Sequence, residues 1–413
     1  MKRFRELCSC INDQCDPATS GASVYIGLEH MDSGAFFLSR QGKSTEVKSA
    51  KSRFKKGDIL YGKLRPYLDK AVIAPTDGIC STDILVFRPA QDICVAYLLG
   101  LIHSPEFLNH AIQTTNGVNH PRTSWTGLST FSWNVPREVE QEKIAAVLWK
   151  IQRAIDIEEK LIATARELKH STMHQLFGRG LHGEKLKETE IGMIPDSWEV
   201  VPLGRHLLLA QYGLSIRGQQ VGRYPILRMN CQLDGKTIFR DLQFVELDQK
   251  TFAAFQVKDG DLLFNRTNSF ELVGRTSIFR SNREAVFASY LIRLTLDQSE
   301  YYPEFVNFYF NQPSVQADLK RLASRGVSQS NISASKLKEY YIPKTSLDEQ
   351  REISGILQSI DSKIEILERK RATLQDLFKT MLHKLMTGEI RVVDLDIDVS
   401  EITDGADHET IRI

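Results

Sequence analysis

The sequence predicts an α+β protein in which two strand-rich globules, in a pseudo-twofold arrangement, are joined by two long helices forming an antiparallel coiled coil. The first observation is a repeated phrase, "EQEKIAAVL" at Glu140–Leu148 and "EQREISGIL" at Glu349–Leu357. The copies begin 349 − 140 = 209 residues apart, too far for a solenoid repeat of roughly 20 to 50 residues. The second observation is that each phrase opens a heptad-spaced apolar stripe. The 413-residue chain is therefore expected to contain two versions of one unit.

The composition is that of an ordinary globular protein. Apolar residues make up 42% and charged residues 25%, which suits two to three domains. No run of about 18 apolar residues occurs, and the start "MKRFRELCSCINDQ" lacks the apolar stretch of a signal peptide. The six cysteines are too scattered for a disulfide framework or a zinc site. A cytoplasmic location with reduced thiols is the expectation.

The two globules are expected over residues 1–136 and 198–343. In the first, "FKKGDILYGKLRP" at Phe54–Pro66 alternates apolar and polar residues, which is typical of a half-buried strand. In the second, "VKDGDLLFNRTN" at Val257–Asn268 repeats the phrase. Short β-branched and aromatic runs between Gly, Asn and Asp predict that both globules are rich in strands.

The two helices are expected over residues 137–180 and 344–389, with a linker over residues 181–197. A proline precedes each repeated phrase and discourages an earlier start, and the glycines after each stripe are expected to stop the helices. Glu140 and Glu349 fall near the positive N-terminal dipoles. An amphipathic helix more often packs on its own globule, but such long stripes favour the two helices packing on each other. The predicted seam consists of Ile144, Leu148, Ile151, Ile155, Ile353, Leu357, Ile360, Ile364 and Leu367, and Leu168 continues the first stripe.

The last 24 residues form an acidic tail, expected over residues 390–413. It contains seven acidic residues and two arginines, so its net charge is −5 and residues 1–389 carry +6. Because few large apolar residues recur with any period, the tail is expected to stay mobile or to dock as an edge segment.

No motif in the sequence predicts catalysis. "GKST" at Gly42–Thr45 lacks the upstream glycine of a phosphate-binding loop, and no nucleophile elbow, metalloprotease motif or methyltransferase tetrad occurs. Asp58 and Asp261 follow glycine at a turn, where an aspartate more often accepts bonds from turn amides than acts in catalysis. No catalytic residue, metal site or resident cofactor is therefore predicted.

Residue types suited to nucleic acid are more frequent. Lysine and arginine neutralise phosphates, whereas arginine, asparagine and glutamine have the geometry to read base edges. The first globule offers Lys43, Lys48, Lys51, Arg53, Lys63 and Arg65, and a polar loop with Asn116, Asn119 and Arg122. The second offers Arg217, Arg223, Arg228, Asn230, Asn265, Arg266, Asn268 and Arg275, and a polar loop with Arg325, Gln329 and Asn331. For any single residue, a solvated charged face or a helix cap remains the alternative.

The order of these phrases resembles the DNA specificity subunit of type I restriction-modification systems. In each half a "GDIL" or "GDLL" phrase is followed by a polar loop with "GV", a proline, the "EQ" dipeptide and a long helix. "IPDSWEVVPLG" at Ile194–Gly204 also resembles that family. The first half lacks this Pro-x-x-Trp entry, and its "PREVEQ" is two residues shorter than "PKTSLDEQ".

The resemblance implies a non-catalytic subunit for defence against phage. The globules would be target recognition domains that each read half of a split, asymmetric site in double-stranded DNA, and the helices would set the gap. Partners would be two adenine-methyltransferase subunits carrying S-adenosylmethionine, and motor-nuclease subunits using ATP and Mg. A coiled-coil adaptor that binds only proteins is the alternative that the nearly neutral charge favours, and a fused enzyme is disfavoured by the missing motifs.

Overall fold

The computed structural model describes residues 1–117, 119–325 and 330–403. Its contacts divide the chain into two compact units: unit 1 from Met1–Leu161 and Leu367–Ile413, and unit 2 from Ile162–Ile366. The sequence predicted a linear series of segments. The units are instead interleaved, because each long helix contributes one end to each unit. The limits of the two recognition domains remain a prediction.

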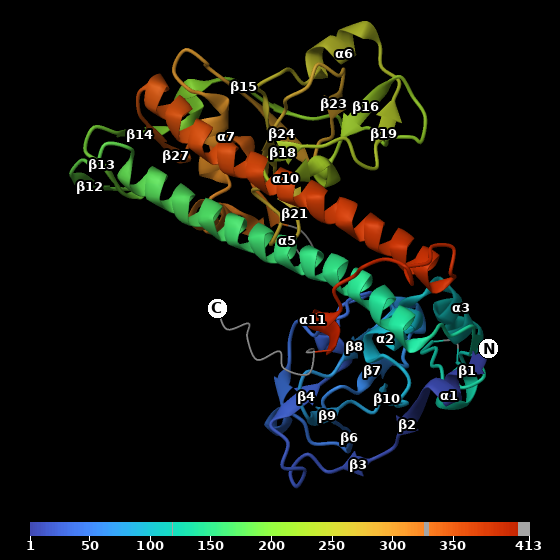
Figure 1. The fold of residues 1–413 in the computed structure, drawn as a ribbon. Coiled ribbons are helices and arrows are strands. Elements are labelled where there is room, and N and C mark those ends of the chain that lie inside the picture. Colours follow the sequence, from blue (N-terminus) through green and yellow to red (C-terminus); the bar gives the residue numbers. More distant parts are fainter. Residues whose placement is uncertain (118, 326–329, 404–413) are drawn as a thin grey trace. The chain divides into compact units, whose positions relative to one another are not determined.

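Unit 1 contains two larger sheets and one short strand pair (Figure 1). A four-stranded sheet has the order β2 (Cys8–Ile11), β10 (Ile84–Pro89), β7 (Ile59–Gly62) and β8 (Ala71–Ile73). A five-stranded sheet has the order β3 (Gln14–Cys15), β6 (Lys51–Phe54), β9 (Gly78–Cys80), β4 (Val24–Ile26) and β5 (Gly42–Lys43). Finally, β1 (Lys2–Arg3) pairs with β11 (Ser132–Trp133).

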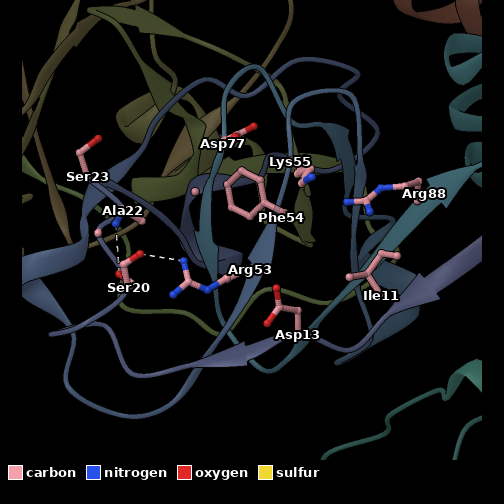
Figure 2. Close-up of a pocket in the computed structure, with 12 residues that line it drawn as sticks. Ile11, Asp13, Ser20, Ala22, Ser23, Arg53, Phe54, Lys55, Asp77 and Arg88 are labelled. Atoms are coloured by element: carbon pink, nitrogen blue, oxygen red, sulfur yellow. Dashed lines mark hydrogen bonds between the residues drawn. The ribbon is translucent and has the colours of Figure 1, made fainter.

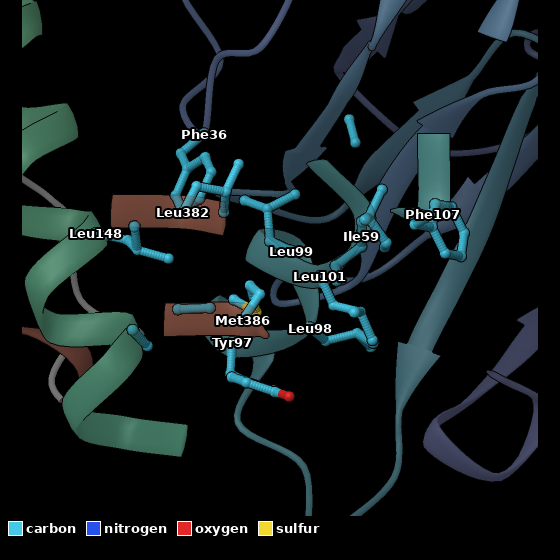
Figure 3. Close-up of a cluster of buried hydrophobic side chains, with 14 of the residues drawn as sticks. Phe36, Ile59, Tyr97, Leu98, Leu99, Leu101, Phe107, Leu148, Leu382 and Met386 are labelled. Carbon is cyan, nitrogen blue, oxygen red and sulfur yellow. The ribbon is translucent and has the colours of Figure 1, made fainter. Parts of the chain in front are cut away.

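The core of unit 1 forms around α2 (Val95–His103), a helix that is apolar on nearly every side and therefore buried (Figure 3). Gly100 allows a close approach here, because a Cβ atom would lie 2.5 Å from the Met386 methyl group. Shorter helices α1 (Phe4–Leu7), α3 (Pro105–Gln113) and α4 (Trp125–Leu128) surround the same cluster of buried residues.

Unit 2 repeats the four-stranded ladder inside a larger sheet. Its six strands have the order β15 (Leu207–Tyr212), β24 (Leu291–Leu296), β20 (Leu262–Asn265), β22 (Thr276–Ile278), β18 (Lys236–Thr237) and β17 (Gln232–Leu233). In unit 1, β10 runs antiparallel to β2 and β7, and in unit 2 β24 runs antiparallel to β15 and β20. The repeated "GDIL" and "GDLL" phrases lead into equivalent strands, β7 and β20.

The other strands of unit 2 form small sheets. One has the order β19 (Gln243–Val245), β16 (Tyr224–Leu227) and β23 (Val286–Phe287), and another β21 (Thr267–Asn268), β26 (Ser330–Asn331) and β25 (Ser324–Arg325). Two strand pairs are β12 (Leu186–Thr189) with β13 (Gly192–Pro195), and β14 (Glu199–Pro202) with β27 (Tyr341–Lys344). The helices are α6 (Gln249–Phe255), α7 (Pro303–Phe310), α8 (Pro313–Leu322) and α9 (Ala334–Lys338).

The two long helices are α5 (Glu138–Arg179), with 42 residues, and α10 (Leu347–Met386), with 40 residues. In unit 1, Leu148 of α5 and Leu382 of α10 belong to one buried cluster. In unit 2, Met173 of α5 and Leu357 of α10 do the same. Each unit therefore contains a packed segment of both helices.

Ion pairs show the direction of this packing. In unit 1, Glu158 pairs with Lys370 at 2.5 Å, and Glu140, nearer the start of α5, pairs with Arg391, which follows α10. In unit 2, the Lys169 ammonium lies 2.6 Å from the Asp361 carboxylate. Within unit 1, the partner number falls from 391 to 370 as the α5 number rises from 140 to 158, so the two segments are antiparallel.

The first part of the acidic tail, residues 390–403, packs against unit 1, which agrees with the docked alternative of the prediction and not with the mobile one. Val392 is buried in the unit 1 cluster. The Lys143 ammonium of α5 donates to the carbonyls of Val393 and Leu395, at 2.7 and 2.8 Å. The short helix α11 (Ser400–Thr403) ends the described segment. The attachment uses Val392, the partly buried Ile390, Ile397 and Ile402, the Arg391–Glu140 ion pair and backbone carbonyls, and these contacts follow no helical or strand period in the sequence.

Within the described ranges, no helix combines the length and apolar character needed to cross a bilayer.

Candidate nucleic-acid interface

The Glu-Gln dipeptide of unit 1 fastens three segments together. The Gln141 amide donates to the carbonyls of Asp92 and Pro136, and its oxygen accepts the Cys94 N–H at 3.0 Å, directly before α2. The Glu140 carboxylate accepts two bonds from the Arg391 guanidinium, at 2.5 and 2.7 Å. Both side chains are buried. These bonds hold the start of α5 against α2 and against the segment that follows α10.

The dipeptide of unit 2 has the same design with different donors. The Gln350 amide donates to the carbonyls of Glu300 and Thr345, and its oxygen accepts the Tyr302 N–H at 2.8 Å, directly before α7. The Glu349 carboxylate accepts the Trp198 indole N–H at 2.9 Å and the Leu181 N–H at 3.2 Å. Both donors follow α5 in sequence. The repeated phrase is therefore structural in both units, and the two glutamates lie in the first turns of their helices.

In unit 1, the residues that follow β7 form backbone hydrogen bonds with the predicted polar loop. The Thr123 N–H donates to the Lys63 carbonyl at 3.0 Å, and the Arg65 N–H donates to the Pro121 carbonyl at 2.7 Å. The Arg122 side chain forms an ion pair with Asp83, with Nε 3.0 Å from Oδ1, and this contact raises the pKa of the guanidinium. The cations after β7 and the amides of the loop thus lie on one surface.

Unit 2 builds the same pairing at the end of β20. The Ile332 N–H donates to the Arg266 carbonyl at 2.9 Å, and Thr267 and Asn268 of β21 pair with Asn331 and Ser330 of β26. The Arg266 guanidinium lies 4.6 Å from the centre of the Tyr212 ring. An arginine stacked on a ring can present donors to phosphates or base edges while its plane is held.

The predicted contact residues differ in exposure. Nine are exposed: Lys43, Lys48, Arg65, Asn116, Asn119, Arg122, Arg217, Arg223 and Arg275. Seven are partly buried: Arg53, Lys63, Arg228, Asn230, Arg266, Asn268 and Asn331. Gln329 lies outside the described residues, and of Arg325 only the backbone, in β25, is described.

Two predicted contacts are wrong because the side chains are buried. Lys51 is 5% exposed, and its ammonium donates to the Ser49 carbonyl and hydroxyl. Asn265 is 1% exposed at the end of β20. All four residues of β20 are buried, so both faces of this strand are covered, and the Lys51 side chain folds back onto the residue Ser49 that precedes β6. Neither side chain can reach DNA without a change of the unit.

Several partly buried candidates are held by the protein itself. The Arg53 guanidinium donates to the Ser20 carbonyl at 2.7 Å, at the edge of a hollow of about 450 Å³ (Figure 2). The Arg228 guanidinium donates to the Asp241 carbonyl, and the Asn230 amide to the Arg240 carbonyl. The hollow is lined by Asp13, Asp77, Lys55 and Arg88 in addition to Arg53. Arg88 comes from β10 and was missed, since nothing local in the sequence connects it with Arg53.

The two Gly-Asp turns have the capping role that the sequence favoured. Asp58 accepts the Lys55 N–H at 2.8 Å and two bonds from the Arg88 guanidinium. Asp261 accepts the Lys258 N–H at 2.7 Å and the Thr295 hydroxyl. Burial raises the pKa of the Asp261 carboxyl, and these bonds oppose that shift. In the part of the chain that the structure describes, no group of three or more His, Cys, Asp or Glu side chains is placed to hold a metal ion.

The predicted seam residues lie mostly on covered faces of the two long helices. Buried members are Ile144, Leu148, Ile155, Ile353, Leu357, Ile364 and Leu367, whereas Ile151 and Ile360 are partly buried. Leu168 is wrong as a seam residue, because its side chain is 55% exposed.

Comparison with known proteins gives consistent matches. The family model described as "Type I restriction modification DNA specificity domain" matches residues 10–167 and 212–376. The putative type I restriction enzyme MjaX specificity subunit of Methanocaldococcus jannaschii is 33% identical over 211 residues, 49% of this chain and 49% of the relative. The match thus spans about half the length of that relative. The EcoKI specificity subunit of Escherichia coli is 22% identical over 315 residues, 74% of this chain and 68% of the relative.

Two solved structures share the fold. The S subunit of a type I restriction-modification system from M. genitalium aligns with a TM-score of 0.57 at 15% identity, over 93% of this chain and 95% of that chain. A chain from a study of complex assembly and conformational transition of the type I R-M system aligns with a TM-score of 0.56 at 18% identity, over 94% and 97%. The α+β fold predicted from the sequence is confirmed.

Proposed function

The chain belongs to the family of type I restriction-modification DNA specificity subunits, and on this premise we propose that it reads a bipartite, asymmetric DNA site with one half assigned to each unit. A specificity subunit is the non-catalytic component of its system. One observation carries the proposal: the same backbone pairing between a strand end and a polar loop is built in both units, with different side chains on it. A common frame with different surface groups suits two different half-sites.

The long helices are proposed as the scaffold and the ruler. Exposed apolar side chains on their outer faces, such as Ile157 at 52%, Ile366 at 51% and Leu377 at 44%, suit contact with partner subunits. Those partners are two adenine-methyltransferase subunits, which would carry S-adenosylmethionine, and motor-nuclease subunits, which would use ATP and Mg. The complex would act on double-stranded DNA in the cytoplasm.

A domain exchange tests the division of labour. Residues 1–136 are replaced by the corresponding segment of another specificity subunit, and methylated sites are mapped in cells that also produce the methyltransferase partner. One half of the methylated sequence should change while the other half stays. A change in both halves would contradict the assignment of one half-site to each unit.

A length change tests the ruler. Adding seven residues to each long helix lengthens it by about 10 Å, since each helical residue adds about 1.5 Å. The unspecified gap between the half-sites should grow by about three base pairs, because one pair occupies about 3.4 Å. Methylation mapping measures the gap, and an unchanged gap would mean that the helices do not set it.

The adaptor alternative, which the nearly neutral charge favours, is distinguished by salt. Duplex binding by the complex with its methyltransferase partner should weaken steeply between 50 and about 200 mM salt, since phosphate contacts release counterions. Binding that depends on neither salt nor sequence would support the adaptor.

A further inference from the structure

A short exposed segment of unit 1, here called the finger, has an unusual backbone. It consists of residues Arg65–Asp69, where the turn Pro66–Leu68 lies between Arg65 at φ 52° and Asp69 at φ 48°. Residues with a Cβ atom rarely adopt this left-handed conformation, and it persists where surrounding contacts hold it. Tyr67, at the tip, is 53% exposed and Leu68 is 39% exposed. The backbone therefore holds an apolar tip toward solvent.

Buried groups hold the base of the finger. The His103 ring lies with Nδ1 2.8 Å from Asp69 Oδ1 and Nε2 3.1 Å from the Ala71 carbonyl oxygen. Both ring nitrogens therefore contact oxygen atoms of the finger and of β8. Phe36 stacks on the ring at 5.3 Å, and the Gly34 N–H donates to the Asp69 carbonyl at 2.8 Å. His103 itself is 4% exposed, so it reaches nothing outside unit 1.

The finger is continuous with the candidate interface. Its first residue, Arg65, donates its N–H to Pro121 of the polar loop, and the preceding Leu64 forms a bridge with Arg122. Tyr67 therefore lies within a few residues of exposed cations and amides. This arrangement places an aromatic ring, a charge and hydrogen-bonding groups on one surface.

Unit 2 carries a matched ring on a different support. Phe270 follows Asp261 by 270 − 261 = 9 residues, as Tyr67 follows Asp58 by 67 − 58 = 9, and it is 40% exposed. The support differs: the Asn311 amide donates to the Thr276 carbonyl at 2.9 Å. Ala71 and Thr276 are the first residues of the equivalent strands β8 and β22. Asn311 thus contacts the first carbonyl of β22, as His103 contacts the first carbonyl of β8.

We propose that Tyr67 and Phe270 are specificity-determining residues whose rings pack directly against bases of the half-site read by their own unit, and that His103 is the positioning residue of the finger. The inference rests on the proposed function and names the groups that carry it. The finger that carries Tyr67 is bonded to the polar loop, and an exposed ring in this setting suits stacking on a base, contact with a thymine methyl group or insertion at a flexible step. It does not suit a phosphate, which the neighbouring cations bind.

The test uses the full chain in complex with its methyltransferase partner. Duplexes randomised over both half-sites are selected by binding and sequenced, for wild type, Tyr67→Ala, Tyr67→Phe and Phe270→Ala. Tyr67→Ala should lower base discrimination at one or two positions of one half-site by about tenfold, and Phe270→Ala should do so in the other half. Tyr67→Phe keeps the ring and should stay within about twofold of wild type.

The outcomes separate the two proposals. If wild type selects no split site, the proposed function fails. If wild type selects a split site but both alanine variants keep full discrimination, the ring contacts are refuted while the proposed function stands. Relaxation of both halves by Tyr67→Ala would also refute the assignment. The slope of binding against salt should not change in Tyr67→Ala, whereas Arg65→Ala should reduce it, because only arginine neutralises a phosphate.

The positioning role of His103 is tested by comparing a variant that removes its polar contacts with one that restores part of them. His103→Leu removes both ring nitrogens and should relax the half-site that depends on Tyr67, whereas His103→Asn supplies an amide donor for the Ala71 carbonyl and should retain more discrimination. Asp69→Gly is the second variant, since glycine tolerates the left-handed backbone without supplying the carboxylate. It should relax the same half-site even if His103→Leu fails to fold. Wild-type discrimination in Asp69→Gly, or equal loss in the two histidine variants, would overturn the positioning role.

Discussion

The start of α5 in unit 1 and the start of α10 in unit 2 carry the same Glu-Gln dipeptide, but only the glutamines have equivalent partners. Gln141 and Gln350 each accept an N–H from the residue before a globule helix and donate to two carbonyls. The glutamates differ, since Glu140 binds the exposed Arg391 and Glu349 the buried Trp198. The glutamine fixes each long helix to its globule, whereas the glutamate fastens the segment that follows the other long helix.

The largest expected loss of stability comes from replacing either glutamine, and it tests whether the two have equivalent roles. Gln141→Leu and Gln350→Leu each remove three hydrogen bonds between a buried glutamine side chain and the backbone, and each such bond contributes about 1 kcal/mol net. Each variant should lower the free energy of unfolding of its unit by about 3 kcal/mol or more. Urea unfolding, with hydrogen exchange to assign the unit, measures this.

Glu352→Gln provides the control for that comparison. Glu352 is exposed on α10, and a surface change of this kind usually alters the unfolding free energy by no more than about 0.5 kcal/mol. If one glutamine variant destabilised its unit and the other did not, the two dipeptides would not have the same role.

A smaller effect sharpens the difference between the glutamates. Trp198→Phe removes the indole donor from the buried Glu349 carboxylate and should cost about 2 kcal/mol in unit 2, because a buried charge-assisted bond is lost. Arg391→Met should cost less, since the guanidinium is 64% exposed and water screens its side of the ion pair. Its main result should be faster amide exchange in residues 390–397. Equal destabilisation by both variants would show that burial of the donor does not matter.

The repeat and the helices could be predicted because their signals are local. The observed helices begin and end within three residues of the predicted limits. The partners of the glutamates could not be predicted, since Arg391 and Glu140 lie 251 residues apart in sequence. Leu168 follows the heptad count but is exposed, because a straight helix has 3.6 residues per turn and drifts from a spacing of 3.5.

The candidate site was harder to predict than the scaffold. Lys51 and Asn265 have suitable side chains, yet both are buried in the fold, and which face of a strand is covered depends on packing between distant segments that is not visible in the sequence. The finger was also hidden, since the support of Asp69 comes from His103, 34 residues away. The exposed cations and amides of both loops remain predictions as DNA contacts.

The smallest expected effect compares the two Gly-Asp turns. Asp58→Asn replaces one of the oxygens that bind the Arg88 guanidinium with an amide group, and should cost about 1 kcal/mol of unfolding free energy. Asp261→Asn keeps an oxygen for the Lys258 N–H and offers its amide to the Thr295 hydroxyl oxygen, so it should change stability at pH 7 by about 0.5 kcal/mol or less. Urea unfolding of both variants at pH 7 measures the pair.

The raised pKa of Asp261 determines how its contribution to stability changes with pH. Burial raises the pKa of its carboxyl above the ordinary value of 3.8, so the folded unit binds this proton more tightly than the unfolded chain. The contribution of Asp261 to stability is therefore greatest below pH 3.8 and declines as the pH rises through the raised pKa. Asp261→Asn should remove this decline, and carboxyl NMR titration of wild type should place the midpoint above 3.8. A midpoint at or below that value would mean that the Thr295 and Lys258 bonds outweigh the effect of burial on the Asp261 carboxyl.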